Sequence, residues 1–163
     1  DLANNFGNLC QRVFSFIERN CSGKLPKFTK FEDVDLALLN NLTDKIDDLI
    51  IDMDKQDLNS YIKKVVDFSF NANKYFNDLE PWALKTNNVD RMNNIMYTIV
   101  TQIKNISILL SPIIPISSEK ILDIMNIEKN DRFLKSINNN NIFDHNLQFK
   151  KTSILFKKIE NDN

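Results

Sequence analysis

Glycine, proline, cysteine and histidine are all scarce in this chain of 163 residues, which has two Gly, four Pro, two Cys and one His. Sandwiches and barrels need frequent turns built with Gly and Pro, so the shortage argues against an all-β fold. With only Gly7 and Gly23, no glycine-rich phosphate loop can form. Cys10, Cys21 and His145 are too few and too far apart for the usual zinc sites, and we expect both cysteines to be reduced thiols.

Long apolar runs are missing as well. The longest, residues 106–116, is interrupted by two serines and two prolines and is shorter than the roughly 18 residues of a membrane span. No basic segment followed by an apolar one opens the chain, so no secretory signal is visible. A net charge of -1 argues against nonspecific electrostatic binding of DNA or another polyanion. We therefore expect a cytoplasmic protein whose partners include neither membrane nor DNA.

Apolar residues recur at helical spacing along most of the chain. They predict long helices over Leu2–Ile17, Leu36–Met53, Leu58–Leu79 and Val89–Leu110. The stripes expected to face the core are Leu2, Phe6, Leu9, Val13, Phe16 and Ile17 in the first helix, Leu36, Leu39, Leu42, Ile46, Leu49, Ile50 and Met53 in the second, Leu58, Ile62, Val65, Val66, Ser69, Phe70, Phe76 and Leu79 in the third, and Val89, Met92, Ile95, Met96, Ile99, Val100, Ile103, Ile106, Leu109 and Leu110 in the fourth. Pro112 and Pro115 end the fourth, and Ser117 or Ser118 is expected to cap a short helix that reaches Met125. The predicted fold class is all-α: an antiparallel helical bundle of four long helices plus a short fifth helix and an extended C-terminal tail.

The chain is expected to form one domain. Residues 1–163 would make a single helical-bundle unit, with the bundle core in 1–128 and a loop and packed tail in 129–163. The asparagine run 138–141 is of low complexity and is expected to be a surface loop. Residues 147–159 could form a short strand or a packed extended tail.

Charge is unevenly spread despite the small total. Residues 8–31 carry a net charge of +4, from five bases and one acid, whereas residues 32–57 carry -7, from nine acids and two bases. The simplest interpretation is the solvated faces of an ordinary bundle. A second hypothesis is that the acidic segment keeps phosphates away from one side of the molecule.

One face of the first helix carries polar residues at spacings of three and four, among them Asn5, Asn8, Arg12 and Arg19. Asn8 and Arg12 are four residues apart and can address one ligand together. An amide offers donors and an acceptor, and a guanidinium offers a rigid fork of donors, so the pair suits a nucleobase edge or a phosphate. The alternative is the ordinary polar flank of an amphipathic helix.

Trp82 is the only tryptophan, and it follows Pro81 between two predicted helices. A lone Trp is often a packing residue, but one held by a proline at the end of a bundle also suits a stacking platform for an unpaired base. Asn8, Arg12 and Trp82 would together read RNA bases if the first helix lies beside residues 80–88. No catalytic residues and no metal ligands are predicted.

Five blocks then carry a resemblance to a known family. They are DLANNFGNLCQRVFSFI (1–17), GKLP (23–26), NKYFNDLEPWALK (73–85), LSPIIPI (110–116) and LFKKIE (155–160). In type and order they resemble the C-terminal anticodon-binding domain of methionyl-tRNA synthetases, which are class I aminoacyl-tRNA synthetases. The last block departs from the family pattern, because two lysines replace its usual Pro-Arg.

This resemblance implies a function for the residues singled out above. Family members recognise the CAU anticodon, above all its first base, with the residues that match Asn8, Arg12 and Trp82, while Pro81 would shape the loop. Asn5 and Arg19 are expected to support them. The segment itself would be inactive and need no cofactor or metal. The parent enzyme would attach methionine to tRNA with ATP and Mg²⁺ in a catalytic domain absent here, together with zinc where that domain has a zinc knuckle.

Two alternatives remain open at this point. The chain could be the anticodon-binding domain of a valyl, isoleucyl, leucyl or cysteinyl relative, which would prefer another anticodon. It could also be a helical module that binds protein rather than RNA.

Overall fold

The structure is a computed structural model, and it describes residues 2–137 and 147–151, with side chains from Asn4 onward. The elements of this part are α1 (Leu2–Asn20), α2 (Asp33–Thr43), α3 (Ile46–Asp54), α4 (Leu58–Leu79), the 3₁₀ helix η1 (Pro81–Leu84), α5 (Val89–Leu110), α6 (Pro115–Ile124), and the 3₁₀ helices η2 (Lys129–Asp131) and η3 (Leu134–Ser136). The predicted all-α helical bundle is confirmed.

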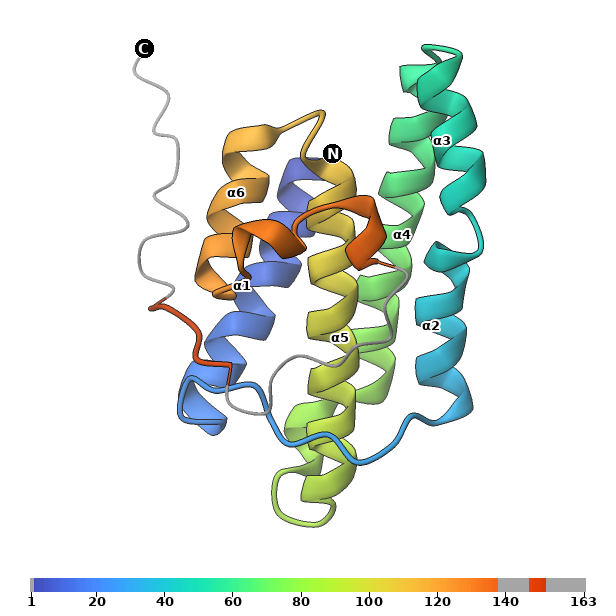
Figure 1. Cartoon of the computed structure of the whole chain (residues 1–163). Helices are drawn as coiled ribbons and strands as arrows, with labels where there is room; N and C mark the ends of the chain where they lie inside the picture. The colour runs from blue at the N-terminus through green and yellow to red at the C-terminus, as the bar shows by residue number, and fades with distance from the viewer. Residues whose placement is uncertain (1, 138–146, 152–163) are drawn as a thin grey trace, which may run out of the picture.

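Helix α5 lies at the centre of the bundle and is buried on nearly all sides. Helices α1 and α4 run along it in the opposite direction, α2 and α3 flank one side, and α6 flanks the other (Figure 1). The turn between α4 and α5 and the connector between α1 and α2 both lie at the lower end of the bundle in Figure 1. We call this end the turn end and define it by residues 21–32 and 80–88.

Polar caps define where the two longest helices begin. The Asp57 carboxylate accepts from the Ser60 N–H at 3.0 Å and caps α4, and the Asn88 side chain accepts from the Arg91 N–H at 3.2 Å and caps α5. Each bond satisfies a backbone donor that has no partner within the helix.

The single second helix expected over residues 36–53 is wrong, because α2 and α3 are separate helices. The backbone N–H of Lys45 bonds to the carbonyl of Leu42, three residues back, so the chain makes a tight turn at Asp44 and Lys45. Asn, Thr and Asp compete for backbone hydrogen bonds, and residues 40–44 contain four of them. The helical spacing of apolar residues continues across this break, so the sequence pattern does not reveal it.

The expected start of the short fifth helix is also wrong. Helix α6 begins at Pro115, with Ile114 at the cap position, and Ser118 is buried within it. Proline suits the first helical position, since its fixed backbone angle is helical and its missing N–H would have no partner there. The serines therefore do not cap this helix.

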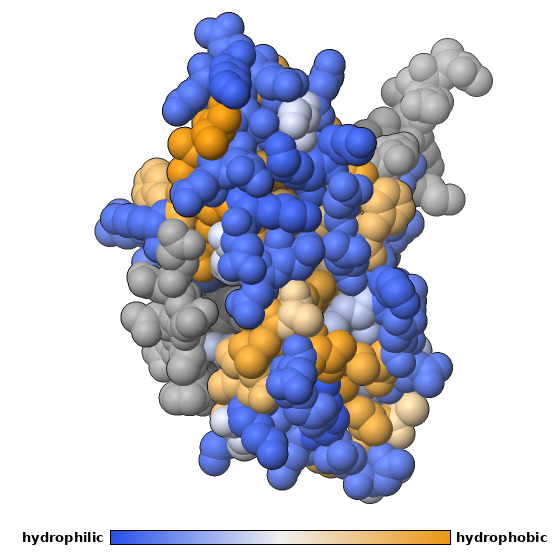
Figure 2. Space-filling model, turned by 90° about the vertical axis from the view of Figure 1, so that its right-hand side faces the viewer, coloured by the Kyte–Doolittle hydropathy of each residue, from blue (hydrophilic) through white to orange (hydrophobic). Residues whose placement is uncertain are grey.

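The predicted core stripes hold only in part. Phe14 and Cys10 are buried although they were not assigned to the core. Conversely, five residues expected in the apolar stripes are 40% or more exposed: Leu36, Ile50, Leu58, Phe70 and Val89. Figure 2 shows the side of α2 and α3, where hydrophobic patches gather among hydrophilic residues in the lower half and the upper half is mainly hydrophilic.

A buried acid joins α2 to α4 and α5. Asp35 is fully buried, and its carboxylate accepts from two guanidinium nitrogens of Arg91 at 2.7 and 2.9 Å. It also accepts from the Tyr75 hydroxyl at 2.5 Å and from the Glu32 N–H at 2.9 Å. Burial alone would raise the pKa of Asp35, but these hydrogen bonds and the Arg91 charge hold the pKa below its usual value.

Residues 147–151 close the turn end from the side of α6. They are extended and packed, as expected: the Leu25 N–H donates to the Leu147 carbonyl at 2.9 Å, and the Phe149 N–H donates to the Gly23 carbonyl at 2.8 Å. The Phe149 ring meets Phe14 edge-on with centroids 5.5 Å apart. Positions 138–146 and 152–163, including the asparagine run and the last block of the resemblance, lie outside the described residues, and the division at residue 128 stays a prediction.

Candidate nucleic-acid interface

The loop that carries Trp82 is shaped by the two residues before it. Glu80 ends α4 in the left-handed conformation, with φ 43° and ψ 59°, which reverses the chain direction. Pro81 follows, is buried, and opens η1. Trp82 is the next residue and is 38% exposed.

Trp82 rests on a core aromatic ring. Its indole meets the Phe76 ring at 5.4 Å between centroids and 71° between planes, an edge-to-face contact. Phe76 belongs to the last turns of α4 and is only 1% exposed. Edge-to-face pairs are favourable because a positive ring edge meets a negative ring face. The contact fixes the indole while part of it remains open to solvent.

Arg12 reaches the same ring from α1. Its guanidinium carbon lies 5.0 Å from the Phe76 centroid, and its Nη2 donates to the Asn77 side-chain oxygen at 2.8 Å. The structure therefore brings Arg12 and Trp82 together on one phenyl ring. Asn77 is the only acceptor found for this guanidinium within the described part of the chain, so most of its five N–H donors stay available.

The other predicted side chains of α1 differ in their surroundings. Asn8 is exposed and lies one turn before Arg12, so both belong to one face. Arg19 is exposed in the last turn, further toward the turn end. Asn5 is engaged in packing, since its side-chain oxygen accepts from Asn73 at 2.9 Å and its amide lies 3.4 Å from the Ser69 hydroxyl. Their roles in binding stay predictions.

Three residues of this site were missed by the sequence reasoning. Phe76 belongs to the predicted core stripe and is buried, but its contact with both candidate side chains, Arg12 and Trp82, is visible only in three dimensions. Asn77 had no distinguishing pattern. Lys85 was noticed only as part of a block, and its Nζ lies 5.9 Å from the Phe16 ring, which adds a cation beside α1. A cation over an aromatic face is attracted by the ring quadrupole.

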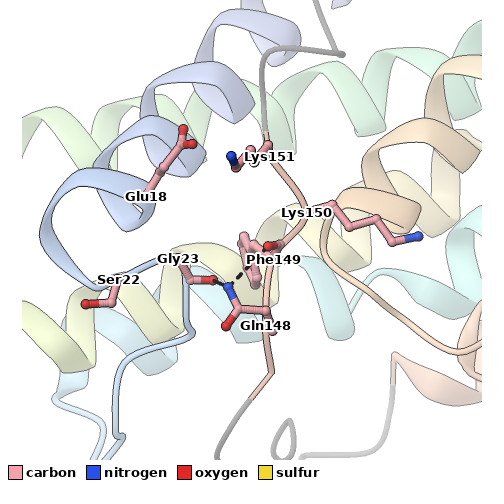
Figure 3. A pocket seen from close by; sticks show the side chains of 7 residues that line it. All are labelled: Glu18, Ser22, Gly23, Gln148, Phe149, Lys150 and Lys151. Atoms are coloured by element: carbon pink, nitrogen blue, oxygen red, sulfur yellow. Dashed lines mark hydrogen bonds between the residues drawn. The ribbon is translucent and has the colours of Figure 1, made fainter.

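A second feature of the turn end is an open pocket of about 330 Å³. Its lining residues are Glu18, Ser22, Gly23, Gln148, Phe149, Lys150 and Lys151 (Figure 3). The Gln148 amide donates to the Gly23 carbonyl at 3.1 Å, and Gly23 has φ 70°. The pocket thus surrounds the contact that holds the start of the connector against the extended segment.

The thiols of this region are poorly suited to reaction. Burial raises the pKa of Cys21 to about 11 and raises that of the fully buried Cys10 further. In the described ranges, no three His, Cys, Asp or Glu side chains gather as metal ligands would. None of the helices described is both long and apolar enough to cross a membrane.

The chain is similar in sequence to known proteins of one family. The family described as "Anticodon binding domain of methionyl tRNA ligase" matches residues 25–163. The methionine–tRNA ligase of Brucella suis is 36% identical over 132 residues, covering 81% of this chain and 26% of that protein. The Rickettsia conorii enzyme is 29% identical over 163 residues, covering 98% of this chain and 32% of that protein.

Solved structures give the same result. The free form of Mycobacterium tuberculosis methionyl-tRNA synthetase has a TM-score of 0.85 and 26% identity, and the match covers 96% of this chain and 32% of that one. The same enzyme in complex with methionyl-adenylate has a TM-score of 0.86 and 26% identity, with coverages of 97% and 31%.

The chain spans between a quarter and a third of the length of the curated relatives it matches. The chain shares an all-α helical-bundle fold with these matched proteins. It belongs to the anticodon-binding domain family of methionyl-tRNA ligases.

Proposed function

We propose that this chain binds the CAU anticodon loop of the methionine tRNA, and that Asn8, Arg12 and Trp82 read its bases. The observation that carries the proposal is the shared support of Arg12 and Trp82 by Phe76. A half-exposed indole offers a face for base stacking, and a neighbouring guanidinium offers donors to a base edge. Asn8 adds an amide on the same side of α1, and Arg19 adds a positive charge one to two turns further along.

The parent enzyme, on this proposal, attaches methionine to tRNA in the cytoplasm. ATP and Mg²⁺ are assigned to its catalytic domain, as is zinc where that domain has a zinc knuckle. The anticodon-binding segment would supply recognition and no chemical step. Neither a membrane nor DNA is proposed as a partner. Support comes from the family match and from the names of the relatives, which are methionine–tRNA ligases.

The proposal is tested by titrating the chain with anticodon hairpins. CAU, GAU and CAC loops on one stem, measured by fluorescence anisotropy at fixed salt, should bind with CAU tightest. Trp82→Ala should weaken CAU binding by about 1–3 kcal/mol, the range for loss of one stacked base. Phe133→Ala is the matched control, since Phe133 is an aromatic residue 57% exposed in the loop before η3.

Arg12→Ala separates base reading from phosphate contact in the same titration. If the guanidinium reads the first base, the variant should lose preference for CAU over GAU. Equal losses for both hairpins would show that Arg12 contacts only phosphate. Absence of salt-dependent binding to every hairpin would refute the proposed function and favour the protein-binding alternative.

A further inference from the structure

The connector between α1 and α2 carries two sets of residues with a repeat of three. Leu25 is buried, and Phe28 and Phe31 are partly buried against the core. A second set, one residue earlier in each repeat, is exposed and consists of Lys24, Lys27 and Lys30. Because burial repeats at every third residue, the first set faces the core and the second set faces solvent. We call the exposed set the lysine ridge.

Contacts with the first turns of α5 hold the connector in place. The Phe28 ring stacks on the Tyr97 ring with centroids 4.5 Å apart, and the centroids of the Phe28 and Phe31 rings are 4.4 Å apart. The Thr29 N–H donates to the Asn94 side-chain oxygen at 2.9 Å, and the Asn94 amide donates back to the Thr29 hydroxyl at 3.0 Å. The inward set thus fixes the backbone, and the ridge projects from a defined path.

The ridge is long enough to follow several phosphates. Six residue steps separate Lys24 from Lys30, and at about 3.3 Å per extended residue they span at most about 20 Å. Successive phosphates of one strand are only about 3.4 Å apart along a duplex axis. Three lysine ammonium groups on flexible stems can each meet a different phosphate over that length.

The ridge belongs to the basic stretch of residues 8–31, whose net charge is +4. Among the described residues, no salt bridge joins Lys24, Lys27 or Lys30 to an acid. The nearest acid in sequence, Glu32, lies 3.3 Å from the Arg91 guanidinium. The acids of α3 lie toward the opposite end of the bundle (Figure 1). This local excess of positive charge explains how a chain of net charge -1 can attract RNA.

The position of the ridge links it to the anticodon site. Both the connector and η1 lie at the turn end, where α5 begins (Figure 1). Arg19 in the last turn of α1 and Lys85 beside the Phe16 ring of α1 add two further cations. We propose that the lysine ridge binds the sugar-phosphate backbone of the same RNA whose loop bases are read at Trp82 and Arg12. This inference rests on the proposed function.

The test compares two triple variants of the chain that each remove three positive charges. K24Q/K27Q/K30Q removes the ridge. K55Q/K63Q/K120Q removes three exposed lysines away from the turn end, one directly after α3, one in α4 and one in α6. Each protein is titrated with the CAU hairpin between 50 and 200 mM NaCl. Thermal melting by circular dichroism checks that both variants fold as the unmodified chain does.

The salt dependence of binding is the decisive measurement. Loss of three phosphate contacts should reduce the slope of log K against log salt by about 2, at roughly 0.7 per contact on a single strand. The ratio of the binding constant of the unmodified chain to that of the ridge variant should then be about 15-fold larger at 50 mM than at 200 mM salt. A slope difference of about 2 over a fourfold change in salt concentration gives this factor. Preference for CAU over GAU should persist, because phosphate contacts carry no sequence information.

Several results would overturn the proposal. An unchanged slope for the ridge variant, or equal losses in both triple variants, would show that these lysines make no local contact. If the ridge variant loses its preference for CAU while the salt slope of log K stays unchanged, the lysines contact bases rather than phosphates. If the unmodified chain itself binds no hairpin, the proposed function fails rather than the ridge alone. Should the triple variant not fold, the single K27Q variant, with an expected slope change of about 0.7, takes its place.

Discussion

Replacing Arg91 with methionine should be among the most damaging single changes to this fold. Methionine keeps most of the side-chain length and removes the charge and both bonds to the Asp35 carboxylate, which is fully buried. Removing one partner of a buried ion pair typically costs about 3–5 kcal/mol, because the other charge is left uncompensated. This loss is a large part of the roughly 5–15 kcal/mol by which whole domains are typically stable. At a urea slope near 2 kcal/mol per M, Arg91→Met should lower the urea midpoint by about 2 M.

The pH dependence of this loss follows from the pKa of Asp35. In the unmodified chain this pKa is lowered, so its contribution to stability is present above the unfolded value of about 3.9 and disappears as pH falls through the lower folded value. Without Arg91, burial dominates and raises the pKa. The carboxylate of the variant then becomes protonated in mild acid, and the penalty should be smaller at pH 4.5 than at pH 7.

An exposed ion pair supplies the control. Lys74 and Asp78 pair on α4 with side chains 74% and 57% exposed, and Lys74→Met should cost no more than about 0.5 kcal/mol. Urea unfolding followed by far-UV circular dichroism at both pH values measures all three proteins. If Arg91→Met costs no more than Lys74→Met, or if its penalty grows in acid, the buried pair does not stabilise the fold as argued.

Two further predictions concern the turn end and the thiols. Gly23→Ala should destabilise the chain by about 1–2 kcal/mol in urea unfolding, because Gly23 has φ 70° and a Cβ would lie 2.9 Å from the Gln148 amide nitrogen. Gly7→Ala within α1 is the matched control, and its effect on stability should be neutral or stabilising. Iodoacetamide at pH 7 should label neither cysteine quickly, and Cys21, with a pKa of about 11, should react before the buried Cys10 as pH rises. Rapid labelling of Cys10 in the native protein would contradict its burial.

The helices could be predicted from sequence because their apolar faces repeat every three to four residues. The break at Asp44 could not, since Leu42 and Ile46 keep that repeat while the backbone turns. The same limit explains the wrong core assignments of Leu36 and Phe70. A helix that packs on one side only exposes apolar residues that the repeat alone assigns to the interior.

Long-range partners were the other part that sequence could not supply. Asp35 lies in an apolar helix, and its buried state depends on Arg91, which is 56 residues away. Arg12 and Trp82 could be selected by residue type and by family resemblance. Their meeting point on Phe76 required the packing of α1 against α4.

The shared support of Arg12 and Trp82 has a consequence for the thermodynamics of binding. Phe76 is a core residue, so both side chains rest on a part of the molecule that is ordered before any ligand arrives. Immobilising a flexible side chain on binding costs about 0.5–1.5 kcal/mol, and a preorganised one avoids much of that entropic loss. If the proposed function holds, two preorganised side chains lower the entropic loss of RNA binding. Changes that loosen the end of α4 should then weaken RNA binding even where they touch no RNA.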